Sequence, residues 1–296
     1  MPIGARVKPA PFTYVRAASL DEALARLDAA GEAKILAGGQ SLVPMLNMRL
    51  VRPATLVDIN GLPGLDAIHA ARDGGLVIGA LARHTDLLAA ALVRERAPLL
   101  AAATAHVGHR AIRNRGTLGG SLAHADPAAE LPAAVVALDA TLTVASPSGR
   151  RRIPAREFFR GPLTTALEPR EILVEIEIPG PAATAWGFAE LARRAGDFAL
   201  AGVAGVVRPA PGEGARCATA RLVAFGCDDT PIRLPAAESL LAGASIDAAL
   251  ARAAGEAAAA VVSPHEDVHG SAEYRRHLVA VLTERVVLDA AARLHG

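Results

Sequence analysis

Three consecutive residues, Pro179, Gly180 and Pro181, interrupt this chain of 296 residues at a point where strand pairing cannot continue. The strand-like segment EILVEIEI ends directly before them, and a new pattern of apolar segments begins after them. A chain of this length can bury more than one core. We therefore predict one domain over residues 1–179 and a smaller domain over residues 182–296, both of which mix helices with strands.

Local patterns predict the elements of the first part. The segment SLDEALARLDAAG predicts a helix that Ser19 caps, with Glu22 three residues later, and that ends at Gly31. The apolar segments AKILA, TLVDIN and GLVIGA predict strands of one buried sheet. A helical run over residues 84–107 is expected to bend or break at Pro98.

Residues 107–132 have no sustained period of either kind and are predicted to be mostly loop, which in a compact domain is usually functional or disordered. After them, TLTVASP and EILVEIEIP predict strands with one solvated face. In the second part, FALAGVAGVV and ATARLVAFG predict strands, and helices follow over residues 236–262. In a last helix, Tyr274, Leu278, Leu282 and Val286 are expected to share one face.

Composition excludes several classes of protein. The 31 basic and 30 acidic residues give a net charge of +1, and aromatic residues make up 3%, so neither phosphate-backbone binding nor stacking on single strands is favoured. Two cysteines cannot build a disulfide framework or hold an iron–sulfur cluster by four thiolates of this chain alone. No apolar segment is long enough for a membrane span, and residues 1–16 lack the core of a secretory signal, so we expect a cytoplasmic protein.

Two glycine pairs carry the strongest indication of a ligand. In AGGQSL, Gly38 and Gly39 follow a predicted strand, and glycine there permits close approach of backbone amides to an anion such as a diphosphate. For this single pair taken alone, a tight connection that binds no ligand is the favoured interpretation. The second pair, Gly119 and Gly120, lies beside small hydroxyl residues in RGTLGGSL, and two such loops can hold one extended diphosphate. Neither loop matches the GxGxxG or GxxxxGK[ST] fingerprints.

Other polar groups near these loops permit two interpretations each. The arginines of HRAIRNR form either a solvated or partner-facing surface or an anion clamp. His124, Asp126 and Glu130 resemble metal ligands, but no second histidine cluster supports a metal site. Glu130 fits either a sugar-hydroxyl acceptor or a residue of the first turn of a helix that Pro127 opens.

Catalytic side chains are not evident. No Ser–His–Asp or Cys–His arrangement can be assembled, and Cys217 and Cys227 are interpreted as small buried apolar residues. At the start of an apolar strand, Phe198 follows Gly196 and Asp197, and its ring fits either the core or a cover for a flat ligand. The sequence thus predicts places that hold a ligand and little that reacts.

Three stretches, AGGQSLVPMLNMR, IRNRGTLGGSLAHADPAAELP and ARRAGDFALAGVA, in this order and at these separations, resemble the flavin-binding medium subunit of the molybdenum hydroxylases. This is the family of the carbon monoxide dehydrogenase medium chain and of the FAD domain of xanthine dehydrogenase. The resemblance covers essentially the whole chain, including the terminal SPHEDVHGSAEYRRHLVAVLTERVV. It implies an α+β fold: a two-subdomain FAD-binding domain of the PCMH type, followed by a smaller α+β domain of the carbon monoxide dehydrogenase flavoprotein type.

The resemblance also implies which residues contact FAD. They come from the first glycine loop, from the second glycine loop with its flanks, and from positions near the flavin ring. These residues are Ala37, Gly38, Gly39, Gln40, Ser41, Leu42, Val107, Ile112, Thr117, Gly119, Gly120, Ser121, His124, Asp126, Glu130, Leu167, Asp197 and Phe198.

This sequence departs from the family pattern near the flavin. Val107 replaces an aromatic residue, and Phe198 stands where the family often has tyrosine. Ala189, which follows Phe188, stands where xanthine dehydrogenase has a lysine. The expected consequence is an altered flavin potential or choice of acceptor.

The activity implied by the resemblance is an electron relay. FAD in this chain would receive electrons from [2Fe-2S] clusters of a small subunit, after oxidation of substrate at a molybdopterin centre in a large subunit, in a dimer of heterotrimers. No catalytic or metal-binding residue is expected in this chain. Two alternatives stay open: a stand-alone flavin dehydrogenase or oxidase, and a non-catalytic assembly subunit without flavin. Carbon monoxide, purines, aldehydes and N-heterocycles stay open as substrates, and NAD, a quinone or oxygen as acceptors.

Overall fold

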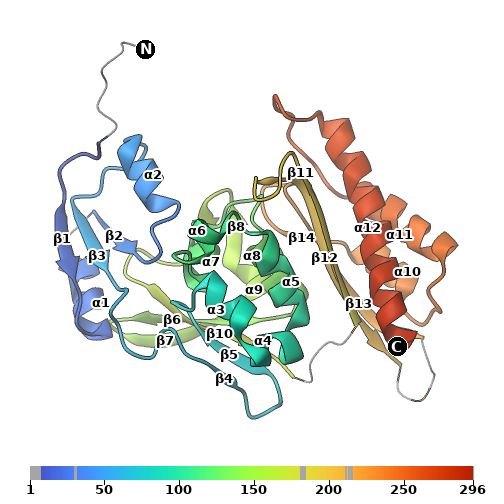
Figure 1. The fold of residues 1–296 in the computed structure, drawn as a ribbon, viewed down its shortest axis with the longest axis horizontal. Coiled ribbons are helices and arrows are strands. Elements are labelled where there is room, and N and C mark those ends of the chain that lie inside the picture. Colours follow the sequence, from blue (N-terminus) through green and yellow to red (C-terminus); the bar gives the residue numbers. More distant parts are fainter. Residues whose placement is uncertain (1–7, 30–31, 181–184, 211, 213–215, 296) are drawn as a thin grey trace.

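The computed structural model describes residues 8–29, 32–180, 185–210, 212 and 216–295. Along these residues the chain forms three blocks that follow one another from the N-terminus to the C-terminus (Figure 1). Residues 1–7 of the N-terminal segment, Gly31, where the first helix was predicted to end, and Pro181 of the predicted boundary lie outside the described residues.

The first block is a parallel sheet of order β1-β3-β2 with two helices. Its elements are β1 (Thr13–Arg16), α1 (Leu20–Ala29), β2 (Ala33–Leu36), α2 (Leu42–Asn47) and β3 (Thr55–Asp58). The predicted cap of α1 is confirmed, because Ser19 Oγ accepts from the amide of Glu22 at 3.1 Å and Glu22 accepts from the amide of Ala18 at 2.9 Å. Parallel strands end at one edge of a sheet, and that edge is where ligands bind in open α/β sheets.

The second block contains a five-stranded antiparallel sheet of order β4-β5-β10-β6-β7 and a two-stranded sheet, β8-β9. Its helices cover one face of the larger sheet (Figure 1). The elements are β4 (Ile68–Ala70), β5 (Leu76–Gly79), α3 (His84–Ala89), α4 (Ala91–Arg96), α5 (Pro98–His106), α6 (Arg110–Arg113), α7 (Leu118–His124), α8 (Glu130–Ala137), β6 (Thr141–Ser146), β7 (Gly149–Pro154), α9 (Ala155–Phe158), β8 (Phe159–Gly161), β9 (Thr164–Thr165) and β10 (Ile172–Ile178).

Several predictions for this region were wrong. GLVIGA contributes β5 to the second sheet, where β5 pairs with β4 and β10, and so does not join AKILA and TLVDIN. The helical run over residues 84–107 breaks before Pro98, as expected, but also at Ala90. Residues 107–132 contain α6, α7 and the start of α8 in place of a loop. Every residue of α8 is buried, and a helix buried all round has no amphipathic period to detect. This helix begins at Glu130 and not at Pro127.

The third block is an antiparallel sheet of order β11-β12-β13-β14 with three helices. Its elements are β11 (Ala185–Ala192), β12 (Ala199–Pro209), β13 (Cys217–Phe225), β14 (Ile232–Arg233), α10 (Pro235–Leu241), α11 (Ala248–Ala259) and α12 (Ala272–His295). The helices cover the outer face of the sheet, and its other face packs on α5 and α8 of the second block (Figure 1). Because both faces are covered, β12 is buried throughout residues 199–207.

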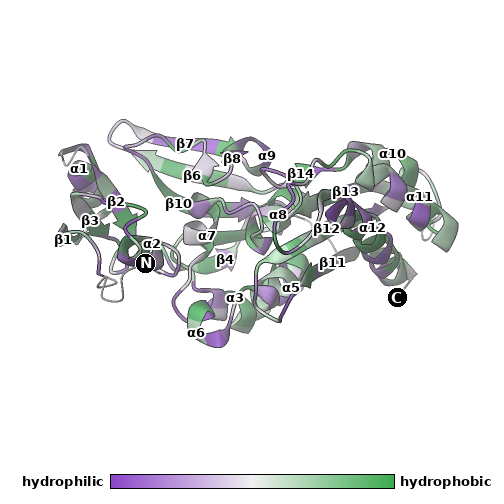
Figure 2. Ribbon diagram, turned by 90° about the horizontal axis from the view of Figure 1, so that it is seen from above, coloured by the Kyte–Doolittle hydropathy of each residue, from purple (hydrophilic) through white to green (hydrophobic). Residues whose placement is uncertain are grey.

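Most of the expected core of this block is confirmed. Cys217 and Cys227 are free and buried in it. Leu278, Leu282 and Val286 form the buried face of α12, but Tyr274 is 43% exposed and does not belong to that face. Figure 2 shows the hydrophilic residues of β7, whose sequence is GRRRIP, along an outer strand of the second sheet. None of the helices in the described ranges is both long and apolar enough to cross a membrane.

Candidate functional site

The first glycine loop connects β2 to α2 at the carboxyl edge of the parallel sheet. Gly38 is buried, and Gly39 has φ +72°, a conformation that L side chains rarely adopt. The backbone amides of residues 38–41 donate to no backbone carbonyl within the described part of the chain. Gln40 Nε2 instead donates to the carbonyl of Gly38 at 3.1 Å. The loop therefore presents consecutive amide donors, which is the chemistry of an anion cradle.

This loop lies directly against the stretch that precedes the second glycine pair. A Cβ on Gly38 would lie 2.4 Å from the carbonyl oxygen of Arg115 and 2.8 Å from Cα of Gly116. Such distances to backbone atoms leave no room for any side chain. The sequence expectation that the two loops face each other is thus supported by a direct contact, through Arg115 and Gly116.

The second glycine pair differs from the open loop that the sequence predicted. Gly119 and Gly120 lie in the first turn of α7, where Thr117 caps the helix by accepting from the amide of Gly120 at 3.0 Å. The amide of Gly119 donates to the carbonyl of Ala80 at 2.8 Å, and a Cβ on Gly119 would lie 2.5 Å from Cβ of Ala80. Packing alone therefore requires glycine at position 119, and that glycine does not by itself indicate a ligand.

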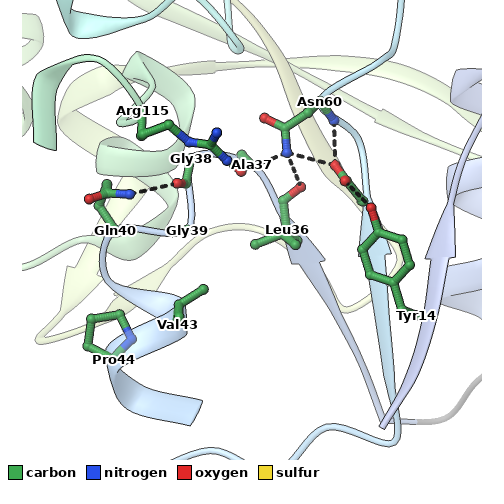
Figure 3. Close-up of a pocket in the computed structure, with 11 residues that line it drawn as sticks. Tyr14, Leu36, Ala37, Gly38, Gly39, Gln40, Val43, Pro44, Asn60 and Arg115 are labelled. Atoms are coloured by element: carbon green, nitrogen blue, oxygen red, sulfur yellow. Dashed lines mark hydrogen bonds between the residues drawn. The ribbon is translucent and has the colours of Figure 1, made fainter. Parts of the chain in front are cut away.

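A cavity of about 490 Å³ opens beside the first loop (Figure 3). Four predicted residues line it, namely Ala37, Gly38, Gly39 and Gln40. The other lining residues are Tyr14, Leu36, Val43, Pro44, Asp58, Asn60 and Arg115, and of these the sequence had indicated only Arg115, in the interpretation of the HRAIRNR arginines as an anion clamp. The cavity thus combines loop backbone with an apolar rim and a few polar side chains, as ligand sites usually do.

Asp58, the last residue of β3, is a fixed charge at the edge of this cavity. The hydroxyl of Tyr14 donates to its Oδ2 at 2.5 Å, and the backbone and side-chain amides of Asn60 donate to its Oδ1 at 2.8 and 2.7 Å. Burial acts to raise the pKa of Asp58, but these hydrogen bonds and Arg16 together outweigh burial and hold that pKa below its ordinary value. The hydrogen bond to Asp58 in turn raises the pKa of Tyr14.

Asn60 connects the two blocks through hydrogen bonds. Its side-chain amide also donates to the carbonyl of Ala37 at 2.8 Å, in the first loop (Figure 3). Its Oδ1 accepts from Nη2 of Arg83 at 2.7 Å, and Nη1 of Arg83 donates to the carbonyl of Arg115. This network ties β3, the first loop and the Arg115 stretch into one unit. A sequence signal for it existed, because Asp58 ends, and Asn60 follows, a strand parallel to the one that precedes AGGQSL.

His84 lies beneath the second loop. It is 4% exposed, and burial lowers its pKa to about 4, so the ring is neutral at pH 7. A Cβ on Gly116 would lie 2.7 Å from its Cε1. Gly116 is therefore another position at which close packing, and not a ligand, accounts for glycine.

The remaining predicted residues lie outside the lining of this cavity. Val107 and Leu167 are half-buried against the central core. Ile112 packs on Gly108, and Asp126 Oδ1 accepts from the amide of Ala128 at 2.9 Å. The other predicted residues outside the lining lie in three places. Ser41 and Leu42 are at the start of α2, Ser121 and His124 are in α7, and Asp197 and Phe198 are in the turn over residues 193–198.

Glu130 is buried between the second and third blocks, near the half-buried Glu190 and the exposed His106. It is 7% exposed, and burial, with a smaller effect of Glu190, raises its pKa to about 7. Nδ1 of His106 lies 3.1 Å from Oε1 of Glu190, and this contact raises the pKa of His106. The His106 ring also packs on Phe188 with a centroid distance of 5.0 Å.

Ala189, which departs from the family pattern, and the arginines of HRAIRNR have distinct surroundings. Ala189 is buried in the core beneath α12, on the face of β11 opposite to Phe188. Arg113 folds back and donates to the carbonyls of Val107 at 3.0 Å and Gly108 at 2.7 Å, while Arg110 and Arg115 are exposed. Across the described ranges, no group of three histidine, cysteine, aspartate or glutamate residues is arranged to hold a metal ion.

Comparison with known proteins gives consistent matches over almost the whole chain. The model of the FAD binding domain in molybdopterin dehydrogenase matches residues 10–181, and that of the CO dehydrogenase flavoprotein C-terminal domain matches residues 186–290. The 6-hydroxypseudooxynicotine dehydrogenase complex subunit alpha of Paenarthrobacter nicotinovorans is 42% identical over 289 residues, which are 97% of this chain and 97% of that protein.

Solved structures agree with these matches. A chain of quinoline 2-oxidoreductase from Pseudomonas putida 86 is 40% identical with a TM-score of 0.93, over 98% of this chain and 100% of that chain. A chain of carbon monoxide dehydrogenase from Hydrogenophaga pseudoflava is 38% identical with a TM-score of 0.92, over 96% of this chain and 99% of that chain.

Proposed function

The chain belongs to the family of FAD-binding subunits of molybdopterin dehydrogenases of the CO dehydrogenase flavoprotein type, and from this membership we propose that it is an electron-transfer subunit. It accepts electrons from [2Fe-2S] clusters of a partner and passes them to an external acceptor. The α+β fold class and the FAD cofactor expected from the sequence are confirmed at the level of the family. The observation that carries the proposal is the first glycine loop, whose free amides adjoin the cavity.

The residues present fit FAD. A diphosphate needs several donors converging on adjacent oxygens, and the amides of residues 38–41 supply them. Arg115 adds a positive charge at the cavity wall, while Val43 and Pro44 offer apolar surface for a ring system. We propose that these residues, with Thr117, which caps α7, and Ser121 of α7, hold the cofactor. Leu167, Asp197 and Phe198 stay predicted contacts of the flavin ring.

When bound, FAD supplies reversible transfer of one or two electrons, so the protein need not supply a nucleophile or a catalytic acid. The tasks left to this chain are binding, orientation and electrostatics. Asn60 fixes the carbonyl of Ala37, and Arg83 fixes that of Arg115, so the two loops keep one separation. We therefore propose no catalytic residue in this chain.

We further propose a large molybdopterin-binding partner and a small [2Fe-2S] partner in a dimer of heterotrimers. The relatives are named as parts of enzymes for a nicotine derivative, quinoline and carbon monoxide, at similar identity to this chain. This spread supports a division of labour in which the large partner selects the substrate. The exposed surface around Arg110 to Arg115 is proposed to face a partner. Alanine at Arg110, which does not line the cavity, should weaken assembly without lowering the flavin content. The cytoplasmic location stays a prediction.

The first test is the visible absorption spectrum of the purified chain, followed by release and identification of the flavin. One FAD per chain, without molybdenum or iron, is the expected result. The bound flavin is reduced with dithionite, and transfer of its electrons to artificial acceptors, without oxidation of any organic substrate by the isolated chain, would support the relay over a stand-alone enzyme. A colourless protein that takes up no added FAD would refute the proposal and favour an assembly subunit.

A further inference from the structure

The turn between β11 and β12, residues 193–198, reaches from the third block to Gly108 and His109, which follow α5 of the second block. Strand pairing ends at Ala192 and Ala199, so contacts outside the ladder must fix the residues between them. A Cβ on Gly196, which has φ +85°, would lie 2.8 Å from Cε1 of His109 and 2.9 Å from the carbonyl oxygen of Gly108. The turn therefore lies against the segment after α5, and it carries Phe198, whose side chain is 69% exposed.

One end of this turn is held by a buried arginine of α12. Arg275 is only 7% exposed. Its Nη1 donates to the carbonyl of Leu200 at 2.6 Å and to that of Gly226 at 3.0 Å. A guanidinium is retained in such a place only when its charge is paired. Its partner is Asp267, whose Oδ2 accepts from Nη2 at 2.8 Å.

The other end of the turn is held through the same aspartate. Asp267 Oδ1 accepts from the amides of His269 at 2.8 Å and Gly270 at 3.1 Å, which fixes the loop that precedes α12. Nδ1 of His269 lies 2.8 Å from Nη1 of Arg193. Asp267 is thus the junction between the Leu200 side and the Arg193 side of the turn.

We propose that Arg275 and Asp267 are positioning residues that hold the 193–198 turn, and with it Phe198, against Gly108 and His109, which follow α5. The inference rests on the proposed function for the role of the turn at the flavin, but not for the clamp itself. If Arg275 only stabilised the fold, its hydrogen bonds to the carbonyls of Leu200 and Gly226 would be sufficient for that role. The connection from Asp267 through His269 to Arg193 adds nothing to the sheet, and it reaches only the turn.

The test compares Asp267→Asn with the wild-type full-length chain by limited trypsin digestion. The substitution weakens the bond to Arg275 and replaces one acceptor oxygen with an amide. Cleavage after Arg193 and Arg194, which are both exposed, reports release of the turn, and cleavage after Arg150 or Arg152 on β7 reports general loosening. The measured quantity is the ratio of the two initial rates, read from fragment masses, so a global loss of stability cancels.

We expect this ratio to rise at least about threefold in Asp267→Asn, since cleavage of a transiently opened segment follows its open population. The matched control is Asp229→Asn, which removes a carboxylate 2.9 Å from His265 in the same loop region but outside the clamp, and its ratio should stay at the wild-type value. A second variant, Arg275→Lys, should behave like Asp267→Asn. A wild-type ratio in both clamp variants would overturn the proposal.

A second readout concerns the flavin. With FAD bound, Asp267→Asn should change the flavin fluorescence yield relative to the wild type, whereas Asp229→Asn should not. A released turn with unchanged fluorescence would overturn the positioning role of the clamp at the cofactor. Failure of the wild-type chain to bind FAD would refute the proposed function, and the digestion ratio would still decide whether the clamp holds the turn.

Discussion

Replacing Gly38 with alanine tests whether the contact between the two loops builds the cofactor site. The added Cβ would lie 2.4 Å from the carbonyl oxygen of Arg115, where real contacts of this kind essentially never fall below 3.0 Å. The two backbones must therefore separate by at least 0.6 Å, the difference between 3.0 and 2.4 Å, and by 1.0 Å to reach an ordinary contact at 3.4 Å. No flexible side chain can absorb this shift, because the obstructing atoms are backbone.

Overpacking of this kind costs about 1–3 kcal/mol. Part of the cost should appear as a lower free energy of unfolding. The rest should appear as weaker FAD binding, because the hydrogen bonds of Asn60 and Arg83 hold the loops together while the new methyl group forces them apart. If most of the cost falls on binding, the Kd for FAD should rise by about tenfold to a hundredfold.

The assay is titration of the apoprotein with FAD, followed by flavin fluorescence, beside urea unfolding of the same apoprotein. The matched control is Gly161→Ala, since a Cβ on Gly161 meets nothing within 4 Å and its φ is not left-handed. The control should bind FAD like the wild type. If Gly38→Ala also binds FAD with wild-type affinity and unfolds at the same urea concentration, the loops are not in the contact described and the argument for the cradle fails.

Three other predictions follow from the same structure. Asn60→Ala leaves the carbonyl of Ala37 and one donor of Arg83 without their partner, so urea unfolding should show a loss of about 1–3 kcal/mol, and FAD binding should weaken as well. The pKa of Glu130 is raised from its ordinary 4.5 to about 7, so the folded state keeps a proton that the unfolded state has lost; the contribution of Glu130 to the free energy of unfolding should therefore fall by up to about 3 kcal/mol as the pH rises from about 4.5 to about 7, opposite in sign to that of His84. Urea unfolding of Glu130→Gln at pH 5 and pH 7.5, chosen as roughly the two sides of this range, should show the loss of that dependence, and an unchanged slope would contradict it. Burial raises the thiol pKa to about 11 for Cys217 and about 12 for Cys227, so a maleimide at neutral pH should label neither thiol in the folded chain and both after unfolding, as mass spectrometry would show.

The part of the fold that could be predicted is the part set by local chemistry. Ser19 and Glu22 predict the start of α1, because a capping box is a short-range pattern. The strand β12 is recognisable because it is apolar on both faces, and its environment is buried on both faces. The partner of β5 was misassigned, because an apolar segment of four residues carries no information about the strand with which it pairs.

The site could be predicted from its glycines only where a glycine is required by the ligand loop and not by packing against another side chain. At Gly38 the cause is the approach of a second backbone beside free amides, and the interpretation as a ligand loop agrees with the structure. At Gly119 the same residue type is required by Ala80, and at Gly116 by His84, neither of which is near them in sequence. A single sequence shows that a side chain is absent but not which neighbour excludes it. The second glycine pair was therefore interpreted as an open loop although it begins a helix.

The pKa shifts that arise from charged residues distant in sequence could not be predicted from local sequence patterns. Glu130 is acidic in the first turn of a helix, and that local role was foreseen. Its raised pKa depends on burial between two blocks and on Glu190, which lies 60 residues further along the chain, in a strand that also brings its carboxylate to His106. Such a group responds to the fit between the blocks, so a change in how the third block packs on α5 and α8 should alter its protonation. Glu130, which the resemblance predicts to contact FAD, thus has a pKa that depends on how the second and third blocks pack together. The pH dependence of unfolding of Glu130→Gln tests this raised pKa independently of the flavin.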